Sequence, residues 1–501
     1  MNESHAKKLT SGHLLVRNTV YSFIIQILPI FVAVLSIPLL IKTLGTDRFG
    51  ILTLAWMVIS YFSLFDLGLG RALTQLVSEK IGSGDDQDLP VLIWTASLLM
   101  FGLGLLGTLC LALISPWLVY NVLKVPKSIQ LETLNSFYLL SASIPIVTST
   151  AGFAGILSAW QRFDLLSFVR IPMGLFTFVG PLLVLPFSRN LLAVVTVLVI
   201  GRMIAWTIHI LLCIRVMPTL RHEVKFEKKL LVPLLRFGGW MTVSNILDPI
   251  MLSMDRFFVG AFVSVTAVSY YSTAYEVANK LLLIPSAVLN VLFPAFATSY
   301  QDSKEHTRIL FFRGVKYIYI CMFPLTLIVV SGADIIFKLW LGEDFAINSS
   351  PILRLLTIGI FIDSLAYTPW AFLQGIKRPD LPAKINMVEL PFYIMVFWWL
   401  THTYGLFGAA ISWTLRIVVN TVLYFYASQG ILKISTDEIR KSLLTFGASI
   451  IILIIGTLPM SLVMKALFLF VTIFGFLCYV WFILDKDERI KILEILSLVK
   501  Q

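Results

Sequence analysis

The sequence predicts an all-α polytopic membrane protein with about 14 transmembrane helices, and three observations support this fold class. The first is composition: of the 501 residues, 58% are hydrophobic and only 13% are charged, about half the charged share of a soluble domain. A soluble protein of this length needs a polar surface that this composition cannot supply. The second is that the hydrophobic residues gather in runs of about 20, the length that a membrane-spanning helix needs. The third is the one-sided distribution of lysine and arginine between these runs.

Fourteen apolar runs define the predicted spans, and the loops between them are short. The first run, at about 18–41, is too long for the core of a signal peptide, so we expect it to remain as a span. No loop exceeds about 25 residues, which leaves no room for an extramembrane domain. The other predicted spans lie at about 49–66, 89–114, 131–157, 165–187, 190–214, 231–254, 266–297, 309–331, 350–375, 385–401, 405–429, 442–463 and 466–484.

The 39 lysines and arginines of the chain are distributed asymmetrically between the two sides of the predicted spans. The loops on the side of the N-terminus carry 27 of them and the opposite loops carry nine, while Arg202, Lys280 and Arg416 lie inside spans. Because positively charged loops remain in the cytoplasm, both termini are predicted to be cytoplasmic. The same bias explains most of the net charge of +11, so we expect no nucleic-acid partner.

A short internal repeat divides the chain into two halves. Residues Leu157–Leu165 (LSAWQRFDL) return as Leu373–Leu381 (LQGIKRPDL) at an offset of 216, and both copies fall between the fourth and fifth spans of their half. We therefore predict two six-helix lobes, residues 1–215 and 216–430, followed by a hairpin of two spans and a tail in 431–501. An even number of spans makes the lobes parallel repeats, which predicts a carrier that rocks one lobe against the other.

Ionisable side chains inside spans are functional candidates, because each is costly unless it faces water or a partner. Lys280 lies near the middle of the eighth span, and Glu276 lies four residues earlier on the same helix face, so a local ion pair is available. Either this pair neutralises itself and stabilises packing, or Lys280 is a cationic contact in a water-filled cavity that Glu276 tunes. Arg202 and Arg416 occupy equivalent places in the two lobes, either as paired substrate contacts or as a repeated structural feature.

Carboxylates inside spans, or at their ends, are candidates for binding a driving proton or sodium ion. Two of them lie on the seventh span around Pro249, which should kink the helix. One of these is followed directly by Arg256, a further cationic candidate. Nothing in the sequence chooses among the carboxylates, which are Asp66, Asp248, Asp255, Asp363 and Glu389.

No catalytic or metal-binding pattern is present in the sequence. It contains no Walker A glycine loop, no HExxH and no GxSxG motif, so we expect neither ATP hydrolysis nor another enzymatic activity. The four cysteines and six histidines show no ligand spacing, and we expect no metal ion and no other cofactor. The cysteines all lie in apolar runs and are predicted to be small buried hydrophobic residues.

Several short motifs follow one another along both predicted lobes. They are Arg17-Asn18-Thr19, Pro38-Leu39-Leu40-Ile41, Leu44-Gly45, Phe49-Gly50, Asp66-Leu67-Gly68-Leu69-Gly70, Asp255-Arg256-Phe257-Phe258-Val259-Gly260, Tyr275-Glu276-Val277-Ala278-Asn279-Lys280, Leu339-Trp340-Leu341-Gly342 and Gln374-Gly375 through Asp380. In this order they resemble the polysaccharide-repeat-unit (Wzx-type) flippases of the MOP superfamily, which also contains the MATE multidrug exporters and the lipid II flippases. The resemblance covers about residues 14–430.

The resemblance implies transport of an oligosaccharide repeat unit, linked to undecaprenyl pyrophosphate, across a bacterial cytoplasmic (inner) membrane. Such transport serves the synthesis of a surface polysaccharide such as O-antigen, capsule or exopolysaccharide, with membrane lipids and the polysaccharide polymerase machinery as further partners. In related flippases, basic residues on the first, second and eighth helices line the cavity. Arg17 and Lys280 match by position, whereas the second span has no central cation. The extra hairpin is similar to that of the lipid II flippases, where it helps to form a lipid groove.

Two other functions remain open. A cation-coupled exporter of drugs or small metabolites from the same superfamily would share the fold, would need no lipid groove and would tend to carry carboxylates in its cavity. A membrane enzyme, such as a polysaccharide polymerase or ligase, would ordinarily have a large outer loop bearing arginine and histidine, which the short loops argue against. The sequence identifies neither the glycan nor the driving ion nor the oligomeric state.

Overall fold

The protein is helical throughout the part of the chain that the computed structural model describes. That part comprises residues 12–61, 69–83, 88–160, 162–221, 225–230, 254–376, 378, 380–484 and 489. These residues contain no β-strand, which confirms the predicted all-α class. The chain divides into two compact units, Met1–Ser272 and Thr273–Gln501. The helix α11 (Val265–Lys280) crosses the boundary between them.

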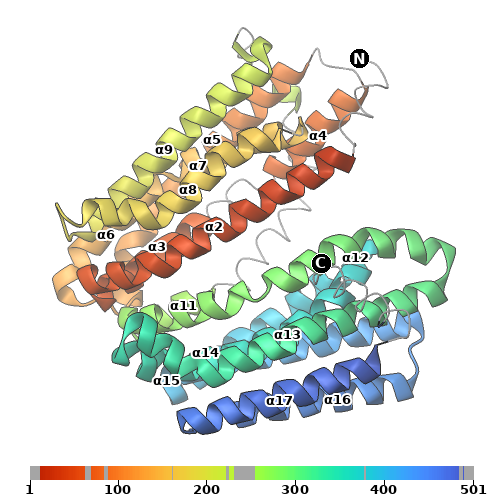
Figure 1. Cartoon of the computed structure of the whole chain (residues 1–501). Helices are drawn as coiled ribbons and strands as arrows, with labels where there is room; N and C mark the ends of the chain where they lie inside the picture. The colour runs from red at the N-terminus through yellow and green to blue at the C-terminus, as the bar shows by residue number, and fades with distance from the viewer. Residues whose placement is uncertain are drawn as a thin grey trace, which may run out of the picture. The chain divides into compact units, whose positions relative to one another are not determined.

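The first unit contains a helix or a pair of helices for each of the first six predicted spans (Figure 1). The fourth span is divided at Ser143, two residues before Pro145, because proline favours the first turn of a helix and interrupts a helix that continues through it. The elements are α2 (Gly12–Leu44), α3 (Thr46–Tyr61), α4 (Leu69–Ser83), α5 (Leu89–Trp117), the π-helix η2 (Leu118–Val122), the 3₁₀-helix η3 (Lys127–Ile129), α6 (Gln130–Ala142), α7 (Ile144–Ala159), α8 (Phe163–Val184), α9 (Leu191–Val216), and the 3₁₀-helices η4 (Pro218–Arg221) and η5 (Lys228–Leu230).

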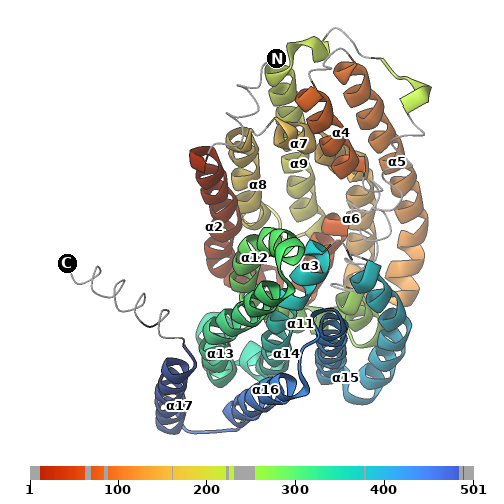
Figure 2. The same cartoon turned by 90° about the vertical axis from the view of Figure 1, so that its right-hand side faces the viewer.

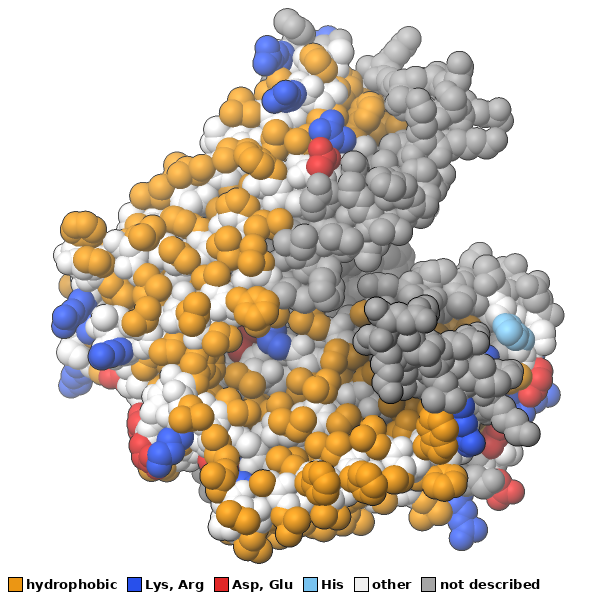
Figure 3. All heavy atoms as spheres, in the orientation of Figure 1, with side chains coloured by type: hydrophobic (Ala, Val, Ile, Leu, Met, Phe, Trp, Pro, Cys, Tyr) orange, Lys and Arg blue, Asp and Glu red, His pale blue; other side chains and the backbone are white. Residues whose placement is uncertain are grey.

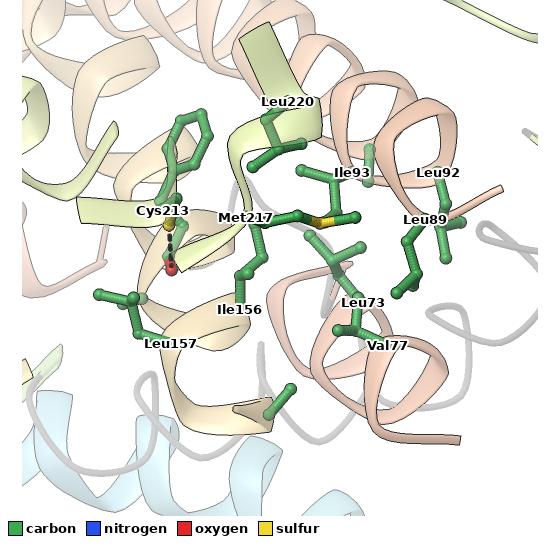
Figure 4. Packing of buried hydrophobic residues seen from close by; sticks show 14 of the residues in the cluster. Leu73, Val77, Leu89, Leu92, Ile93, Ile156, Leu157, Cys213, Met217 and Leu220 are labelled. Carbon is green, nitrogen blue, oxygen red and sulfur yellow. Dashed lines mark hydrogen bonds between the residues drawn. The ribbon is translucent and has the colours of Figure 1, made fainter. Parts of the chain in front are cut away.

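The helix α4 lies beyond the predicted end of the second span and belongs to the core of the first unit. Its apolar residues, including Leu69, Leu73 and Val77, recur at helical spacing on one face. That face packs with α5, α7 and α9, as the close view in Figure 4 shows. In the same cluster the thiol of Cys213 donates a hydrogen bond to the carbonyl oxygen of Phe153 at 3.3 Å.

The prediction that all four cysteines are buried is wrong for three of them. Cys213 is buried, whereas Cys110, Cys321 and Cys478 are exposed. An apolar run places a residue inside the bilayer but does not tell whether its side chain faces protein or lipid, because both surroundings are apolar.

The second unit consists of long helices that pack side by side (Figures 1 and 2). The helix α14 packs against α12, α13 and α15, so it lies at the centre of the unit. The elements are α12 (Leu283–Asp302), α13 (Lys304–Leu341), α14 (Glu343–Gly375), α15 (Asp380–Leu432), α16 (Thr436–Gly456) and α17 (Leu462–Ile483).

The element α15 contains two predicted spans that turn back on each other at Gly405. Gly405 has φ +58°, a left-handed conformation that glycine adopts at little cost. Beyond the turn, Gly408 packs against the backbone of Leu400, and further along Asn420 donates a hydrogen bond to Asn386 at 3.1 Å. These pairings make the two halves of α15 an antiparallel helical hairpin, as the two separate apolar runs predicted.

The internal repeat has the same local geometry in each unit. In the first unit Arg162 donates from Nε and Nη2 to the carboxylate of Asp164 at 2.9 and 2.8 Å. In the second unit Arg378 donates in the same way to Asp380 at 2.9 and 3.3 Å. The backbone N–H of each arginine donates to the carbonyl five residues earlier, at 2.9 Å in both cases. The repeat therefore marks equivalent turns between equivalent helices.

The described helices carry the surface of a membrane protein. Eight of them are long and apolar enough to cross a bilayer, and Leu28–Leu44 and Leu444–Gly456 are shorter apolar segments. On the face in Figure 3, hydrophobic side chains cover most of the described surface, and charged side chains gather mainly near helix ends. Soluble monomers rarely expose apolar areas of this extent. The chain is a multi-pass membrane protein.

The last two predicted spans, α16 and α17, pack on α13. The hydroxyl groups of Tyr319 and Ser449 are hydrogen-bonded at 2.8 Å, and the rings of Phe323 and Phe476 have centroids 4.7 Å apart. Both contacts lie in the middle of the helices, and the aromatic pair adds to the packing there. The hairpin is therefore an integral part of the second unit.

An ion pair at the start of this hairpin makes its attachment sensitive to acid. Arg308 donates to Glu438 at 2.5 Å, and this hydrogen bond holds the pKa of the Glu438 carboxyl below its usual value. Such a carboxylate stabilises the folded state above the unfolded pKa of about 4.3, and the stabilisation is lost as the pH falls through the lower folded pKa.

We expect Glu438→Gln to lower the apparent Tm by about 1–2 °C at pH 7, a small effect because the pair is partly exposed. At the acid end of the pH range the substitution should leave the Tm unchanged. Thermal unfolding of the detergent-solubilised protein between pH 7 and pH 3 measures this difference. An equal loss of Tm at every pH would contradict a role for the charge of Glu438, because glutamine keeps the size of the side chain.

Candidate functional site

A helix break inside the predicted eighth span positions the first candidate pair. The helix α11 ends at Lys280, and α12 begins at Leu283 after a two-residue turn. Pro285 explains the break, because proline lacks a backbone N–H and its ring clashes with the carbonyl four residues earlier. The N–H groups of Leu281 and Leu282 donate instead to carbonyls three residues earlier, at 3.1 Å each.

Lys280 and Glu276 form a local ion pair at this break. The distance from Nζ of Lys280 to Oε2 of Glu276 is 3.3 Å, and the two side chains are 45% and 43% exposed. Half-exposed charges near the middle of a span are costly if lipid surrounds them, and are tolerated where they face water or protein. The exposure therefore favours a pair that faces water over a buried pair that only stabilises packing.

A second charged cluster lies inside the second unit, where α14 meets the two halves of α15. Arg416 is 8% exposed, and its guanidinium lies over the ring of Tyr393, 5.2 Å from the centroid. The charge of Arg416 acts on the carboxylates of both Asp363 and Glu389. The structure thus brings together three candidates that are far apart in the sequence, two of them negative and one positive.

Glu389 is buried with only half of its carboxylate satisfied. It is 7% exposed, and Nδ2 of Asn420 donates to its Oε2 at 2.8 Å. Its Oε1 accepts no hydrogen bond from the described residues, and Nε of Arg416 is likewise buried without a partner among them. Because buried unsatisfied polar atoms are uncommon and costly, these two atoms leave an acceptor and a donor for a further group.

Asp255 and Arg256 lie in the first unit, in the helical segment 254–262. Asp255 is 1% exposed and accepts hydrogen bonds from the hydroxyl of Tyr271 at 2.6 Å and from the backbone N–H of Arg256 at 2.8 Å. Arg256 is 8% exposed. Both oxygens of the Asp255 carboxylate are therefore engaged, and the hydrogen bond from Tyr271 connects the segment to α11.

Four further candidates lie elsewhere in the chain. Arg202 is in α9, and its Nε is buried without a hydrogen bond to any described residue. Arg17 is in α2, but its side chain lies outside the described part. Asp66 and Asp248 both fall outside the described residues.

Comparison with known proteins places this chain in a family. Residues 39–350, more than half of the chain, match the family described as "Polysaccharide biosynthesis protein". The chain belongs to this family. The chain is 28% identical to a putative O-antigen transporter of Shigella flexneri over 414 residues, which cover 82% of the chain and 96% of the relative. It is 24% identical to the lipopolysaccharide biosynthesis protein WzxC of Escherichia coli (strain K12) over 416 residues, 81% of the chain and 79% of the relative.

The chain has the same fold as solved transporter structures. It superposes on the inward-facing conformation of a multidrug resistance MATE family transporter of the MOP superfamily with a TM-score of 0.71 at 13% identity, covering 83% of the chain and 98% of that structure. It superposes on the lipid II flippase MurJ in an inward closed conformation with a TM-score of 0.69 at 16% identity, covering 92% and 98%. These similarities confirm the predicted MOP-type fold.

The sequence contains a pattern that could have predicted the second charged cluster but was not used for that purpose. Polar residues recur at helical spacing on one face of each half of α15, and the two faces meet in the hairpin. Two polar rows at such spacing in consecutive apolar spans indicate a shared polar interface. The first row is Asn386, Glu389 and Tyr393; the second is Arg416, Asn420 and Tyr424.

Proposed function

We propose that this polysaccharide biosynthesis protein flips undecaprenyl-pyrophosphate-linked oligosaccharide repeat units from the inner to the outer leaflet of a bacterial cytoplasmic membrane. It works by alternating access and without enzymatic catalysis. The observation that carries the proposal is the half-exposed pair of Lys280 and Glu276 at a helix break inside the predicted eighth span. A cation there can bind the pyrophosphate during its passage, because phosphate oxygens accept strong hydrogen bonds from charged donors. Membership of the family and similarity to an O-antigen transporter support this substrate class.

The cluster of Asp363, Glu389 and Arg416 is our candidate for coupling transport to a driving ion. It carries one more negative than positive charge, and Oε1 of Glu389 accepts no hydrogen bond within the described residues. One proton or one monovalent cation would neutralise the cluster, and charge inside a membrane is least costly when it is balanced. Arg17 and Arg202 remain candidates for additional contacts with the anionic substrate.

The arrangement that this mechanism requires is two parallel lobes, residues 1–215 and 216–430, with the hairpin and tail of 431–501 attached to the second. The matched Arg–Asp turns at Arg162 and Arg378 support the repeat. The excess of lysine and arginine on one side supports cytoplasmic termini. Membrane lipids surround the protein, and a polymerase on the outer face would receive the flipped units.

Cells depleted of the protein are expected to accumulate the lipid-linked oligosaccharide on the inner leaflet. The accumulated oligosaccharide should be protected from a membrane-impermeant glycan-modifying reagent until the membrane is permeabilised. Re-expression of the wild-type chain should restore both surface polymer and reagent access, which controls for effects of the depletion itself. Isolation of the lipid-linked pool before and after modification measures both quantities and identifies the glycan.

The two alternative functions give different results in the same experiment. Accumulation on the outer leaflet would indicate that units cross but are not joined, as expected for loss of a polymerase or ligase. No accumulation and unchanged surface polymer would exclude flipping of this substrate, and a screen for loss of drug or metabolite efflux would then test the exporter function.

A further inference from the structure

The segment that follows α9 is fixed to the first unit at the start of α5. Nε1 of Trp94 donates a hydrogen bond to the carbonyl oxygen of Leu220 at 3.0 Å, and the backbone N–H of Glu227 donates to Oγ1 of Thr95 at 3.0 Å. Leu220, labelled in Figure 4, packs in the core cluster that also holds α4, α5 and α7. Two hydrogen bonds and one buried side chain therefore hold the segment against α5.

The tryptophans of α5 place this segment at the depth of the lipid headgroups. Trp94 and Trp117 are separated by about six turns of helix, or roughly 35 Å, close to the ~30 Å thickness of the hydrocarbon core. Tryptophan side chains gather at the two membrane–water interfaces, so these two residues mark the boundaries of the core on α5. The segment bonded to Trp94 lies at one boundary, on the cytoplasmic side by the distribution of lysine and arginine.

The basic linker, as we call residues 215–221 and 225–229, carries cations that no described residue neutralises. Within the described part of the chain none of its lysines and arginines forms a salt bridge, and its only carboxylate is Glu227. At the turns of the internal repeat, by contrast, Arg162 and Arg378 are each paired with an aspartate. The cations of the basic linker are all exposed, and they are Arg215, Arg221, Lys225, Lys228 and Lys229. The basic linker thus presents an excess of positive charge to its surroundings.

An exposed aromatic side chain lies among these cations. Phe226 is 48% exposed and stands directly between Lys225 and Glu227 in the sequence. A single exposed aromatic residue is common on protein surfaces, and a single basic segment is common on the cytoplasmic side of membrane proteins. The two together at headgroup depth fit a lipid surface, because the ring can enter the boundary of the hydrocarbon core while the cations meet anionic headgroups.

We propose that the basic linker binds the headgroups of anionic phospholipids in the leaflet that it faces, and that it holds the start of α5 at that leaflet. Because the hydrogen bonds at Trp94 and Thr95 already order the segment, binding costs little further conformational entropy. The contact requires only the membrane and not the proposed substrate. Several cations share the attraction, so loss of a single lysine is expected to leave transport unchanged.

The first test measures the depth of the basic linker in bilayers of two compositions. In a chain whose four native cysteines are replaced by alanine, Phe226→Cys carries a nitroxide, whose apolar ring takes the place of the phenyl ring. The full chain is placed in nanodiscs of phosphatidylcholine, with or without phosphatidylglycerol. Access of a neutral, water-soluble nickel chelate to the nitroxide is expected to be about threefold lower in the anionic discs, because anionic lipid attracts the cations. Equal access in both discs would overturn the proposal.

Two matched sets of substitutions separate the basic linker from the charge of the protein as a whole. The first set replaces the three lysines of the basic linker by glutamine and should abolish the difference between the discs. The control set removes the same charge from three exposed lysines of the second unit and should keep the difference. The control substitutions are Lys304→Gln, Lys384→Gln and Lys433→Gln. A difference that survives the first set would contradict binding by the basic linker.

A second measurement keeps Phe226 and needs no label. The full chain is dissolved in detergent with equal amounts of phosphatidylcholine and phosphatidylglycerol, and mass spectrometry identifies the lipid that stays with the protein after gel filtration. The chain with its native lysines is expected to retain about twice as much phosphatidylglycerol as the chain with the first set of substitutions. Equal retention would remove the lipid contact.

Free inorganic phosphate distinguishes a lipid surface from a site for a soluble anion. Added to the neutral discs, phosphate should leave the access of the nickel chelate unchanged, because it supplies the anion without a charged membrane surface. If phosphate alone lowers the access as much as phosphatidylglycerol does, the basic linker binds a soluble anion and the proposed membrane contact is wrong.

Discussion

Asp334→Asn is expected to destabilise the attachment of the terminal hairpin more than any other single charge removal in the described part of the second unit. The carboxylate of Asp334, in α13, accepts two hydrogen bonds from Nζ of Lys465 at 2.8 and 2.6 Å and one from Nη2 of Arg354 at 3.0 Å. Lys465 lies in the first turn of α17 and is only 6% exposed. Asparagine keeps the shape of the side chain but leaves two cations without a counter-charge.

The expected loss is about 3 kcal/mol, the lower end of the range for breaking a buried pair, because Asp334 itself is 42% exposed. For a unit of this size that corresponds to a fall in apparent Tm of roughly 5–10 °C. Thermal unfolding in detergent, followed by gel filtration of the protein that remains folded, measures this fall.

Two further variants separate the buried charge from a general effect of mutation. Lys338→Gln breaks an ion pair whose members are 63% and 64% exposed, and its Tm should change by no more than about 1 °C. Asp334→Asn combined with Lys465→Met should recover most of the loss, since methionine fills a similar volume without a charge. An unchanged Tm for Asp334→Asn alone would show that water already solvates Lys465.

The fold could be predicted because length and composition decide it. A run of about 20 apolar residues has few alternatives to a membrane span, and α5, α8 and α9 begin and end within a few residues of the predicted bounds. The helix α4 was not predicted, because its face is apolar only at helical spacing and its buried partners lie in α5, α7 and α9. Amphipathic helices of this kind depend on tertiary packing, which a hydropathy run does not contain.

The same distinction between local and distant contacts applies to the charged residues. The ion pair of Glu276 and Lys280 could be predicted from the sequence, because a separation of four residues places both on one helix face. Asp334 and Lys465 are 131 residues apart, so their ion pair could not be predicted from the sequence. Lys465 was counted simply as a cation of an outer loop. The hydrogen bond between Asn420 and Glu389 could be predicted only in part. The two polar rows can be read from the sequence, but their pairing depends on the turn at Gly405.

Lys280→Ala is expected to reduce the supply of surface polymer by about ten- to a hundredfold at unchanged protein abundance. The estimate follows from a charge-assisted hydrogen bond to a phosphate oxygen, worth about 1.5–3 kcal/mol. Lys280→Arg should keep part of the activity because it keeps the charge. Lys229→Ala, at an exposed lysine outside the predicted spans, should have no effect. Quantification of cell-surface polysaccharide, with the protein measured in isolated membranes, gives both values.

The double variant Lys280→Ala with Glu276→Ala decides between the two roles that the ion pair can have. If the pair only balances its own charge, removing Lys280 alone leaves a carboxylate without its counter-charge near the middle of a span, and removing both residues should restore the protein. If Lys280 binds the pyrophosphate, the double variant lacks the cation just as the single variant does and stays inactive. We expect the second result, because the side chains of both residues are nearly half exposed and a pair that served only packing would be buried. Recovery of polymer output in the double variant would remove Lys280 from the transport path.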